Sequence, residues 1–182
     1  MTWLWEYDDS GGYDIVATIR NMEALDKWAV ELSDPLGQGF PVVDIALKSS
    51  GLLPDFFPVG PLRIVSARIK DVVERLGGHA EFFPVSIRGP GIFPSIGAYF
   101  FMHPLDELPC MDAKQSEFTM DDDYIDRISH FVIDESVARR KPIFRLAKSF
   151  VMPLFVSHEL ADSLRSSNVT GVSLEPPSAF TY

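Results

Sequence analysis

The stretch from Lys141 to Pro177 constrains the fold of this chain most, because it encodes a complete strand–helix–strand unit. Two short apolar runs, at residues 143–146 and 154–156, predict strands. Ser157 follows the second run at the position of a helix N-cap, where a side-chain oxygen accepts a free amide of the first turn. Glu159 adds a negative charge in that turn, which suits the helix dipole. We therefore predict a capped helix that begins directly at the end of a strand.

The helix after Ser157 has one apolar face and a defined end. Asn168 or Gly171 can adopt a left-handed conformation and end the unit, and residues 169–174 then predict a returning strand. None of these residues forms a catalytic motif, so the unit is a scaffold. The apolar positions at helical spacing are Leu160, Ala161 and Leu164.

A second stretch, Ile64–Ile87, follows the same order of elements. Ser66 follows an apolar pair, Gly77 and Gly78 stop the helix without steric cost, and a strand pattern resumes at residues 82–87. We interpret the likeness as one common local solution used twice, not as a true repeat. The apolar stripe of the predicted helix, between Ser66 and Gly77, consists of Ile69, Val72, Val73 and Leu76.

The rest of the chain alternates strand patterns with loops rich in proline and glycine. We expect an irregular connection at 49–61 and an acidic turn at Asp121–Asp126. Residues 21–32 predict a helix with Asn21 as its cap and an apolar face of Leu25, Trp28, Ala29 and Leu32. Further strands are expected at residues 2–7, 13–20, 42–48, 96–102 and 128–133.

These patterns contain more strand than helix, and the 14 prolines are spread through connections and do not form a linker. We therefore expect one α+β domain over residues 1–182, with a mixed, mostly antiparallel sheet and two or three serine- or asparagine-capped helices packed on it. A chain of this length buries about two-thirds or more of its unfolded surface, so it needs no metal or disulfide to fold.

The single Cys110 excludes an internal disulfide and a multi-cysteine zinc site. The N-terminus has no basic region and soon meets two aspartates, unlike a secretory signal. No apolar run reaches the roughly 20 residues that a membrane helix requires. We expect a cytoplasmic protein that contacts no membrane and holds no cofactor.

The charge balance is acidic, with 16 Lys and Arg against 26 Asp and Glu and a net charge of −10. Residues 1–60 carry 10 acidic and 3 basic side chains, a net of −7. Such a surface repels nucleic acid and attracts a basic protein partner. The alternative is that the charge only maintains solubility.

No known catalytic or metal-binding pattern appears in the sequence. It holds no His pair at metal-ligand spacing, no nucleophile elbow, no phosphate-binding loop and no dinucleotide fingerprint. Asp121–Asp123 fails the calcium-loop pattern, because Asp126 and Val132 occupy the positions that require Gly and Glu. Cys110 lies among carboxylates, which raise a thiol pKa and make the thiol less reactive. The chain thus offers a scaffold and an acidic surface, which points to a binding protein.

The order and spacing of five segments resemble the immunity protein eleven family of bacterial polymorphic-toxin systems. The resemblance covers roughly residues 40–177, whereas residues 1–40 match poorly and hold most of the excess negative charge. The segments are Leu53–Gly77, Glu81–Ile87, Phe131–Ser136, Ile143–Ala147 and Phe155–Pro177.

The resemblance implies a non-enzymatic function, in which the protein binds a cognate toxin and neutralises it. Toxins of such systems are often delivered by a secretion system, type VI among them, and many resemble nucleases. A nuclease surface is basic, so an acidic inhibitor can occupy its groove as a phosphate mimic. We expect a basic toxin as the partner of a monomer or homodimer. The predicted contacts are Asp8, Asp9, Trp28, Asp121, Asp122, Asp123 and Asp126.

Trp28 is also a natural core residue of its predicted helix. Two alternatives to toxin binding remain open at this point. One is a small enzyme whose site is assembled from distant residues such as Asp44, His103, His130 and Arg145. The other is an oligomeric scaffold protein.

Overall fold

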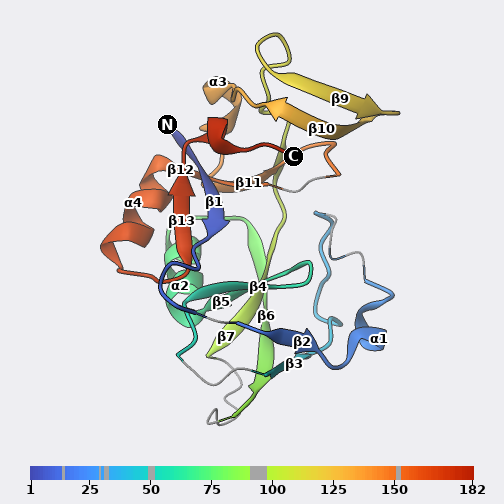
Figure 1. Ribbon diagram of the computed structural model, residues 1–182, viewed down its shortest axis with the longest axis vertical. Helices are drawn as coiled ribbons and strands as arrows, with labels where there is room; N and C mark the ends of the chain where they lie inside the picture. Colours follow the sequence, from blue (N-terminus) through green and yellow to red (C-terminus); the bar gives the residue numbers. More distant parts are fainter. Residues whose placement is uncertain (14, 29, 31–32, 49–51, 91–97, 151–152) are drawn as a thin grey trace.

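A computed structural model describes residues 1–182 except 14, 29, 31–32, 49–51, 91–97 and 151–152. The described residues form two larger sheets and a separate two-stranded hairpin, with short helices beside them (Figure 1). The first sheet has the strand order β13 (Val172–Glu175), β1 (Thr2–Tyr7), β12 (Leu154–Ser157), β11 (Ile143–Leu146) and β8 (Glu107–Leu108).

The second sheet contains six strands and mixes parallel with antiparallel pairs. The β3–β6 pair is parallel, as is β11–β8 in the first sheet, and the remaining pairs are antiparallel. Its strand order is β2 (Ala17–Ile19), β3 (Val43–Leu47), β6 (Ala80–Arg88), β7 (Tyr99–Pro104), β5 (Leu62–Ser66) and β4 (Phe56–Val59).

The α+β class is confirmed, but the expectation of one sheet is wrong. Strand β1, from the N-terminus, lies between β12 and β13 from the C-terminus, with Leu4 opposite Phe155 on one side and Glu175 on the other. The strands β1, β12 and β13 were each recognisable from their local patterns. Which strands pair depends on contacts across the whole chain, and these leave no local signal.

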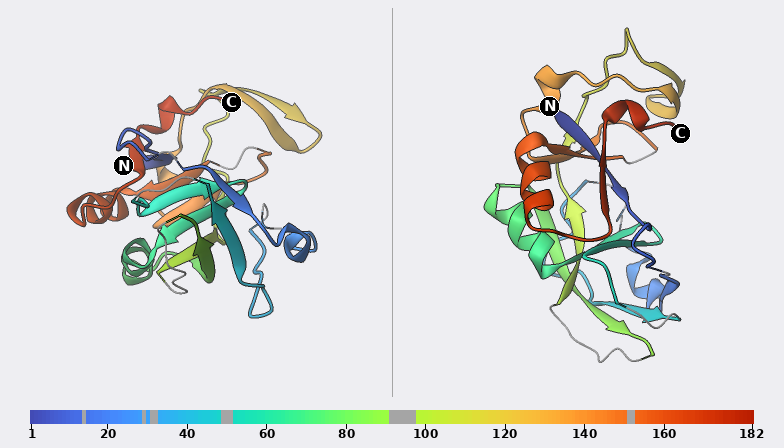
Figure 2. Two further views of the ribbon diagram at one scale, coloured as in Figure 1. Left: turned by 60° about the horizontal axis from the view of Figure 1, so that its bottom comes forward. Right: turned by 60° about the vertical axis from the view of Figure 1, so that its left-hand side comes forward.

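Two strand–helix units stand side by side, as Figures 1 and 2 show. Helix α2 (Ala67–Arg75) follows β5, and α4 (His158–Ser166) follows β12. The Ser66 hydroxyl accepts from Ile69 N at 3.4 Å, and the Ser157 hydroxyl accepts from Leu160 N at 3.2 Å. The apolar faces of both helices share one buried cluster, so the two units form a common layer.

The helix predicted at residues 21–32 is wrong in extent. Helix α1 is a single turn, Met22–Leu25. Asn21 does not cap it with its side chain, because its amide accepts from Asp44 N and donates to the Val42 carbonyl, each at 2.9 Å. Ala29 and Leu32 of the predicted face lie outside the described residues. The strand predicted at 13–20 is confirmed only at Ala17–Ile19.

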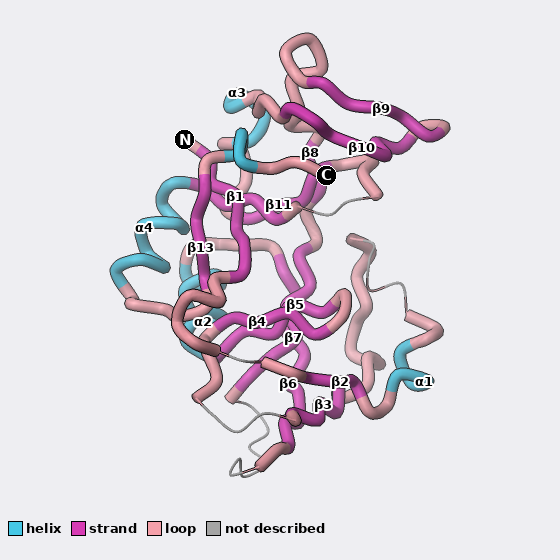
Figure 3. The backbone as a smooth tube through the Cα atoms, in the orientation of Figure 1, coloured by secondary structure: helices cyan, strands magenta, loops and turns pink. Residues whose placement is uncertain are grey.

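The connection expected at residues 49–61 contains a strand, β4 (Phe56–Val59), paired with β5. Pro58 hid this strand from the sequence pattern, and proline is tolerated here because β4 is an edge strand. The strand predicted at 128–133 lies earlier, as β10 (Tyr124–His130), and the acidic turn is confined to Asp122 and Asp123. Figure 3 marks these strands along the backbone.

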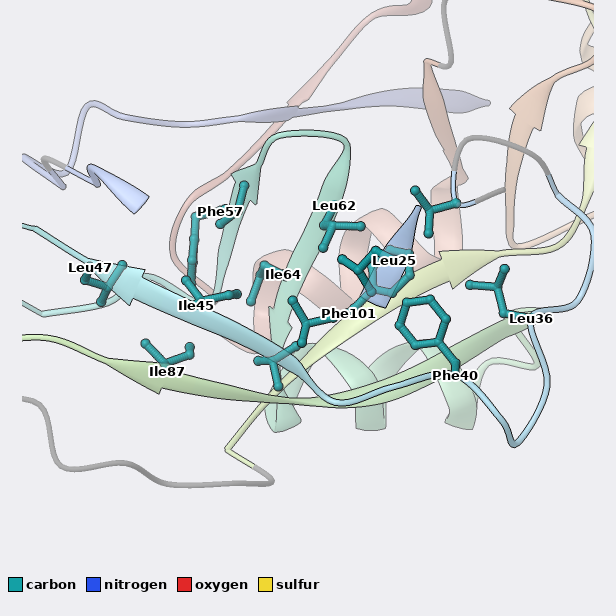
Figure 4. Close-up of a cluster of buried hydrophobic side chains, with 14 residues drawn as sticks. Leu25, Leu36, Phe40, Ile45, Leu47, Phe57, Leu62, Ile64, Ile87 and Phe101 are labelled. Atoms are coloured by element: carbon teal, nitrogen blue, oxygen red, sulfur yellow. The ribbon is translucent and has the colours of Figure 1, made fainter. Parts of the chain in front are cut away.

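The core divides into three clusters of buried apolar side chains. One covers a face of the six-stranded sheet, where Leu25, Leu36 and Phe40 pack over strand residues such as Ile45 and Phe101 (Figure 4). A second lies beneath α2 and α4. The third joins the five-stranded sheet to the hairpin through Phe144, Phe155, Ile125 and Ile128.

Two short helical turns complete the elements, α3 (Glu135–Ala138) and the 3-10 helix η1 (Pro177–Ala179). Within the described part of the chain, no helix is long and apolar enough to cross a membrane. The described ranges also contain no group of three or more His, Cys, Asp or Glu side chains suited to a metal ion.

Candidate protein-docking surface

Strands β9 (Glu117–Asp121) and β10 (Tyr124–His130) form a hairpin that projects from the five-stranded sheet (Figures 1 and 2). Its two-residue turn consists of Asp122 and Asp123. Asp122 has φ 50°, in the left-handed region that tight hairpin turns require and that aspartate tolerates better than most residues. The sequence of the turn therefore places carboxylates at the tip of the hairpin.

From Ile125 onward, β10 is held on the side that β9 leaves free, and we call this held part of the hairpin its base. Ile125 N donates to the Lys148 carbonyl at 2.7 Å, and Phe150 N donates to the Ile125 carbonyl at 3.1 Å. Ile128 and Tyr182 exchange backbone hydrogen bonds of 2.9 and 2.8 Å. The Ile128 side chain is buried against the five-stranded sheet. Because backbone bonds and apolar packing fix the base, the tip is presented in a defined position.

The hairpin is strongly acidic. From Glu117 to His130 it carries five acidic side chains and one basic, Arg127, for a net charge of −4 with histidine neutral. The carboxylates of Asp121, Asp122, Asp123 and Asp126 are exposed. Among the described ion pairs, none involves these four aspartates. They are therefore available to cations from outside the molecule.

Exposed apolar side chains flank this acidic turn on both sides. Met120 precedes it and is 49% exposed, and Tyr124 follows it and is 46% exposed. Tyr124 stacks on Phe150, itself 56% exposed, with ring centroids 5.0 Å apart and an interplanar angle of 20°. Large apolar groups exposed next to charges are typical of protein interaction sites.

An apolar pocket of about 210 Å³ lies against one face of the hairpin. Met120 and Ile125, a cross-strand pair, both line it. The other lining residues are Pro109, Met111, Phe118, Leu146, Ala147 and Lys148. We call the hairpin tip, the Tyr124–Phe150 pair and this pocket together the hairpin surface.

The predicted contact residues do not all lie on the hairpin surface. Asp8 and Asp9 occupy the turn after β1, where Asp8 N donates to the Gly171 carbonyl at 3.1 Å, away from the hairpin (Figure 1). Hydrogen bonds from Ser10 lower the pKa of the Asp8 carboxyl. The structure brings together Asp121, Asp122, Asp123 and Asp126.

Trp28 lies beside the six-stranded sheet and is only partly buried. Its ring meets that of Phe40 edge-on, with centroids 5.4 Å apart, and it packs against the apolar cluster of that sheet. This location agrees with the core interpretation of Trp28. Helix α1, which ends three residues before Trp28, lies apart from the hairpin (Figure 1).

Of the four residues of the enzyme alternative, His103 and Arg145 lie near each other, whereas Asp44 and His130 lie apart from them. His103 is buried, and its Nε2 donates to the Asp34 carbonyl at 2.9 Å. Burial lowers the pKa of His103, and the nearby Arg145 charge lowers it further. Asp44 instead lies 3.4 Å from Arg88, and His130 is exposed on the hairpin.

Polar groups near His103, of which Arg145 is buried, hold a loop in place. Arg145 Nε donates to the Ser33 hydroxyl at 2.9 Å, and that hydroxyl donates to Glu107 at 2.7 Å. The Glu81 carboxylate accepts from the backbone amides of Leu36 and Gly37. These bonds join residues that lie 44 to 112 positions apart, so no sequence motif predicts them. Their geometry is structural, because each group is already hydrogen-bonded within the chain.

A second hollow, of about 290 Å³, lies between β1 and the β4–β5 hairpin. Trp5 and Glu6 line one side, and Pro58 and Arg63 line the other. Burial raises the pKa of the Glu6 carboxyl, and the Arg63 charge opposes this shift. With one carboxylate and one guanidinium, this hollow favours neither sign of ligand charge. The hairpin surface is therefore the better candidate for a charged partner.

The comparison with protein families gave a match to the model described as "Immunity protein family (Imm11)" over residues 7–178. The chain belongs to the Imm11 family. Membership implies an immunity protein directed against a toxin, and it confirms the family that the five segments resemble. The matched range also includes residues 7–40, where no resemblance was expected. The comparison with curated proteins gave no match. In this Imm11 chain the hairpin surface lies within the matched range.

Proposed function

We propose that this Imm11 chain binds a cognate bacterial toxin and neutralises it by stoichiometric protein–protein contact, without turning over a substrate. The observation that carries the proposal is the family match across residues 7–178. Two structural features support it. Asp44 and His130 of the suggested enzyme site lie apart from His103 and Arg145. The hairpin surface exposes large apolar groups beside carboxylates that no described ion pair neutralises.

The charge of the chain favours a basic toxin. Its net charge is −10, and the hairpin contributes −4 in a single projecting element. Complementary charge speeds the encounter of two proteins and disfavours partners of the same sign. A nuclease needs a basic groove to hold nucleic acid. We therefore propose a nuclease-type toxin whose groove the acidic surface covers, with Asp121, Asp122, Asp123 and Asp126 as the main charged contacts.

We place the encounter in the cytoplasm, after a secretion system such as type VI has delivered the toxin. Asp8, Asp9 and Trp28 are retained as proposed contacts of a second region, since a standard protein interface buries about 800 Å² on each partner. The proposed immunity protein acts as a monomer or homodimer. Light scattering measures the oligomeric state of the purified chain and of its complex.

The decisive test is co-expression with the product of the gene immediately upstream. We expect that product to stop growth when expressed alone and to be harmless when this chain is present. With purified proteins, inhibition of the toxin should be complete at one chain per toxin, because the mechanism is occupancy and not turnover. A soluble acidic protein of similar size and charge serves as the control for nonspecific neutralisation.

Any of three results would overturn the proposal. The upstream product could be harmless alone, or it could still kill in the presence of this chain. Neutralisation that becomes complete at a small fraction of the toxin concentration would also contradict it, because only a catalyst acts substoichiometrically.

A further inference from the structure

We infer that the tip of the hairpin, residues Met120–Tyr124, enters a basic cleft of the toxin. In this arrangement the aspartates of the turn face cations in the floor of the cleft. Met120 and Tyr124 contact apolar walls on its two sides. The inference rests on the proposed function and adds to it the contact surface and the chemistry of the partner's site.

Strand geometry places apolar groups on opposite faces of the tip. Successive side chains of a strand point to opposite faces. Met120 pairs with Ile125, and both line the apolar pocket. Tyr124, one residue before Ile125, therefore points to the other face, where it stacks on Phe150. A single flat partner surface would contact only one of these faces, whereas a cleft contacts both.

The hairpin is already ordered before it enters the proposed cleft. The bonds that join Ile125 to Lys148 and Phe150, and Ile128 to Tyr182, are all backbone bonds, so they hold the base independently of the exposed side chains. The tip residues are exposed and project from the sheet (Figure 2). A preordered element loses less conformational entropy on binding than a flexible loop.

The negative charge of the tip favours a basic partner over the other partners that an apolar surface could bind. Asp121, Asp122 and Asp123 lie consecutively between the apolar side chains, and no described ion pair neutralises them. A second copy of this chain would bring a second negative surface, which costs free energy. A cleft with Lys or Arg in its floor and apolar walls matches both features.

The test measures binding of purified variants to a catalytically inactive form of the upstream gene product. We expect the triple substitution D121N/D122N/D123N to slow association about tenfold at low salt, with a smaller effect at high salt, because complementary charge steers the encounter. It should also speed dissociation, because the cations in the floor of the cleft lose their partners. We expect Tyr124→Ala with Met120→Ala to weaken affinity about 30-fold or more, mainly through faster dissociation, as loss of an interface hot spot does.

Two control variants match these changes elsewhere on the surface. D71N/E159Q removes two exposed carboxylates from helices α2 and α4, and Leu52→Ala truncates an apolar side chain that is 87% exposed. We expect both to bind within about twofold of the unaltered chain, as surface substitutions outside an interface do. Circular dichroism and thermal unfolding show whether each variant is folded.

A second measurement locates the contact by the protection of a single introduced thiol. The natural Cys110 is buried, so an exposed thiol introduced by Asp123→Cys is alkylated selectively. We expect alkylation of that thiol to slow severalfold in the complex, while a thiol introduced by Leu52→Cys reacts at the same rate in free and bound protein.

The outcomes separate the two proposals. If the unaltered chain binds the upstream product but the tip variants bind like the controls, this inference is wrong and the proposed function stands. The same conclusion follows if Asp123→Cys is not protected in the complex. If the unaltered chain does not bind at all, the proposed function fails, and the inference fails with it.

Discussion

We predict that Asp55 is the polar residue that contributes most to holding the two strand–helix units together. Its side chain is buried, and one carboxylate oxygen accepts from the Ser66 hydroxyl at 2.6 Å. The other oxygen accepts from Thr170 N at 2.9 Å and from the Thr170 hydroxyl at 3.0 Å. Ser66 caps α2, and Thr170 lies in the connection from α4 to β13. One carboxylate therefore links both units.

Replacing Asp55 by alanine leaves the Ser66 hydroxyl and the Thr170 amide without their acceptor. Ser66 is buried, so its unpaired hydroxyl costs about 1–3 kcal/mol. Thr170 is exposed, and each of its two bonds to the carboxylate contributes about 0.5–1.5 kcal/mol. We therefore expect a loss of roughly 2–6 kcal/mol in the free energy of unfolding. Asp55→Asn should cost less, about 1–2 kcal/mol, because its carbonyl can still accept from Thr170 while its amide donates to Ser66. The Arg68 ion pair, at 3.7 Å and solvent-exposed on the arginine side, adds little.

Equilibrium unfolding in urea measures these losses. Trp5 is buried, so its fluorescence reports unfolding. With an m-value of about 2 kcal/mol per M, Asp55→Ala should lower the midpoint by roughly 1–3 M. Asp71→Ala, an exposed aspartate on α2, is the matched control and should change stability by less than about 0.5 kcal/mol. The predicted role of Asp55 is wrong if Asp55→Ala loses no more stability than Asp71→Ala, or if Asp55→Asn loses as much as Asp55→Ala.

Three further predictions concern single residues. Gly171→Ala should destabilise the chain by about 2 kcal/mol or more in thermal unfolding, because its φ is +77° and a Cβ would lie 2.2 Å from the Phe56 carbonyl oxygen; unchanged stability would contradict this. Burial raises the pKa of Cys110 to about 12, so maleimide should label it at pH 8 only after unfolding. Burial lowers the pKa of His103 from 6.5, so the unfolded chain takes up its proton first. The free energy of unfolding should therefore fall as pH decreases below about 6.5 towards the pKa of His103 in the folded chain. Urea titrations at stepped pH measure this loss, and His103→Gln should reduce it. An unchanged pH dependence of stability in that variant would contradict the prediction.

The candidate site was only partly predictable from the sequence. The run Asp121–Asp123 is visible as an acidic turn, because aspartate favours turns and three in a row cannot be buried. Phe150, which completes the aromatic pair with Tyr124, lies in a different segment and reaches the hairpin only through tertiary packing. Asp8, Asp9 and Trp28 were grouped with the hairpin by charge and residue type, which carry no information about distance. The structure places them elsewhere.

Local residue patterns were enough to predict the strand–helix units, because a serine cap, an apolar stripe and a terminal glycine act over only a few residues. Ser66 and Ser157 each mark the start of their helix to the residue. Long-range packing, in contrast, places β1 between β12 and β13, lets Asp55 join the two units and positions apolar side chains beside the acidic turn. These features depend on pairs of residues far apart in the chain, whose meeting is set by the burial of the whole core and not by local preference.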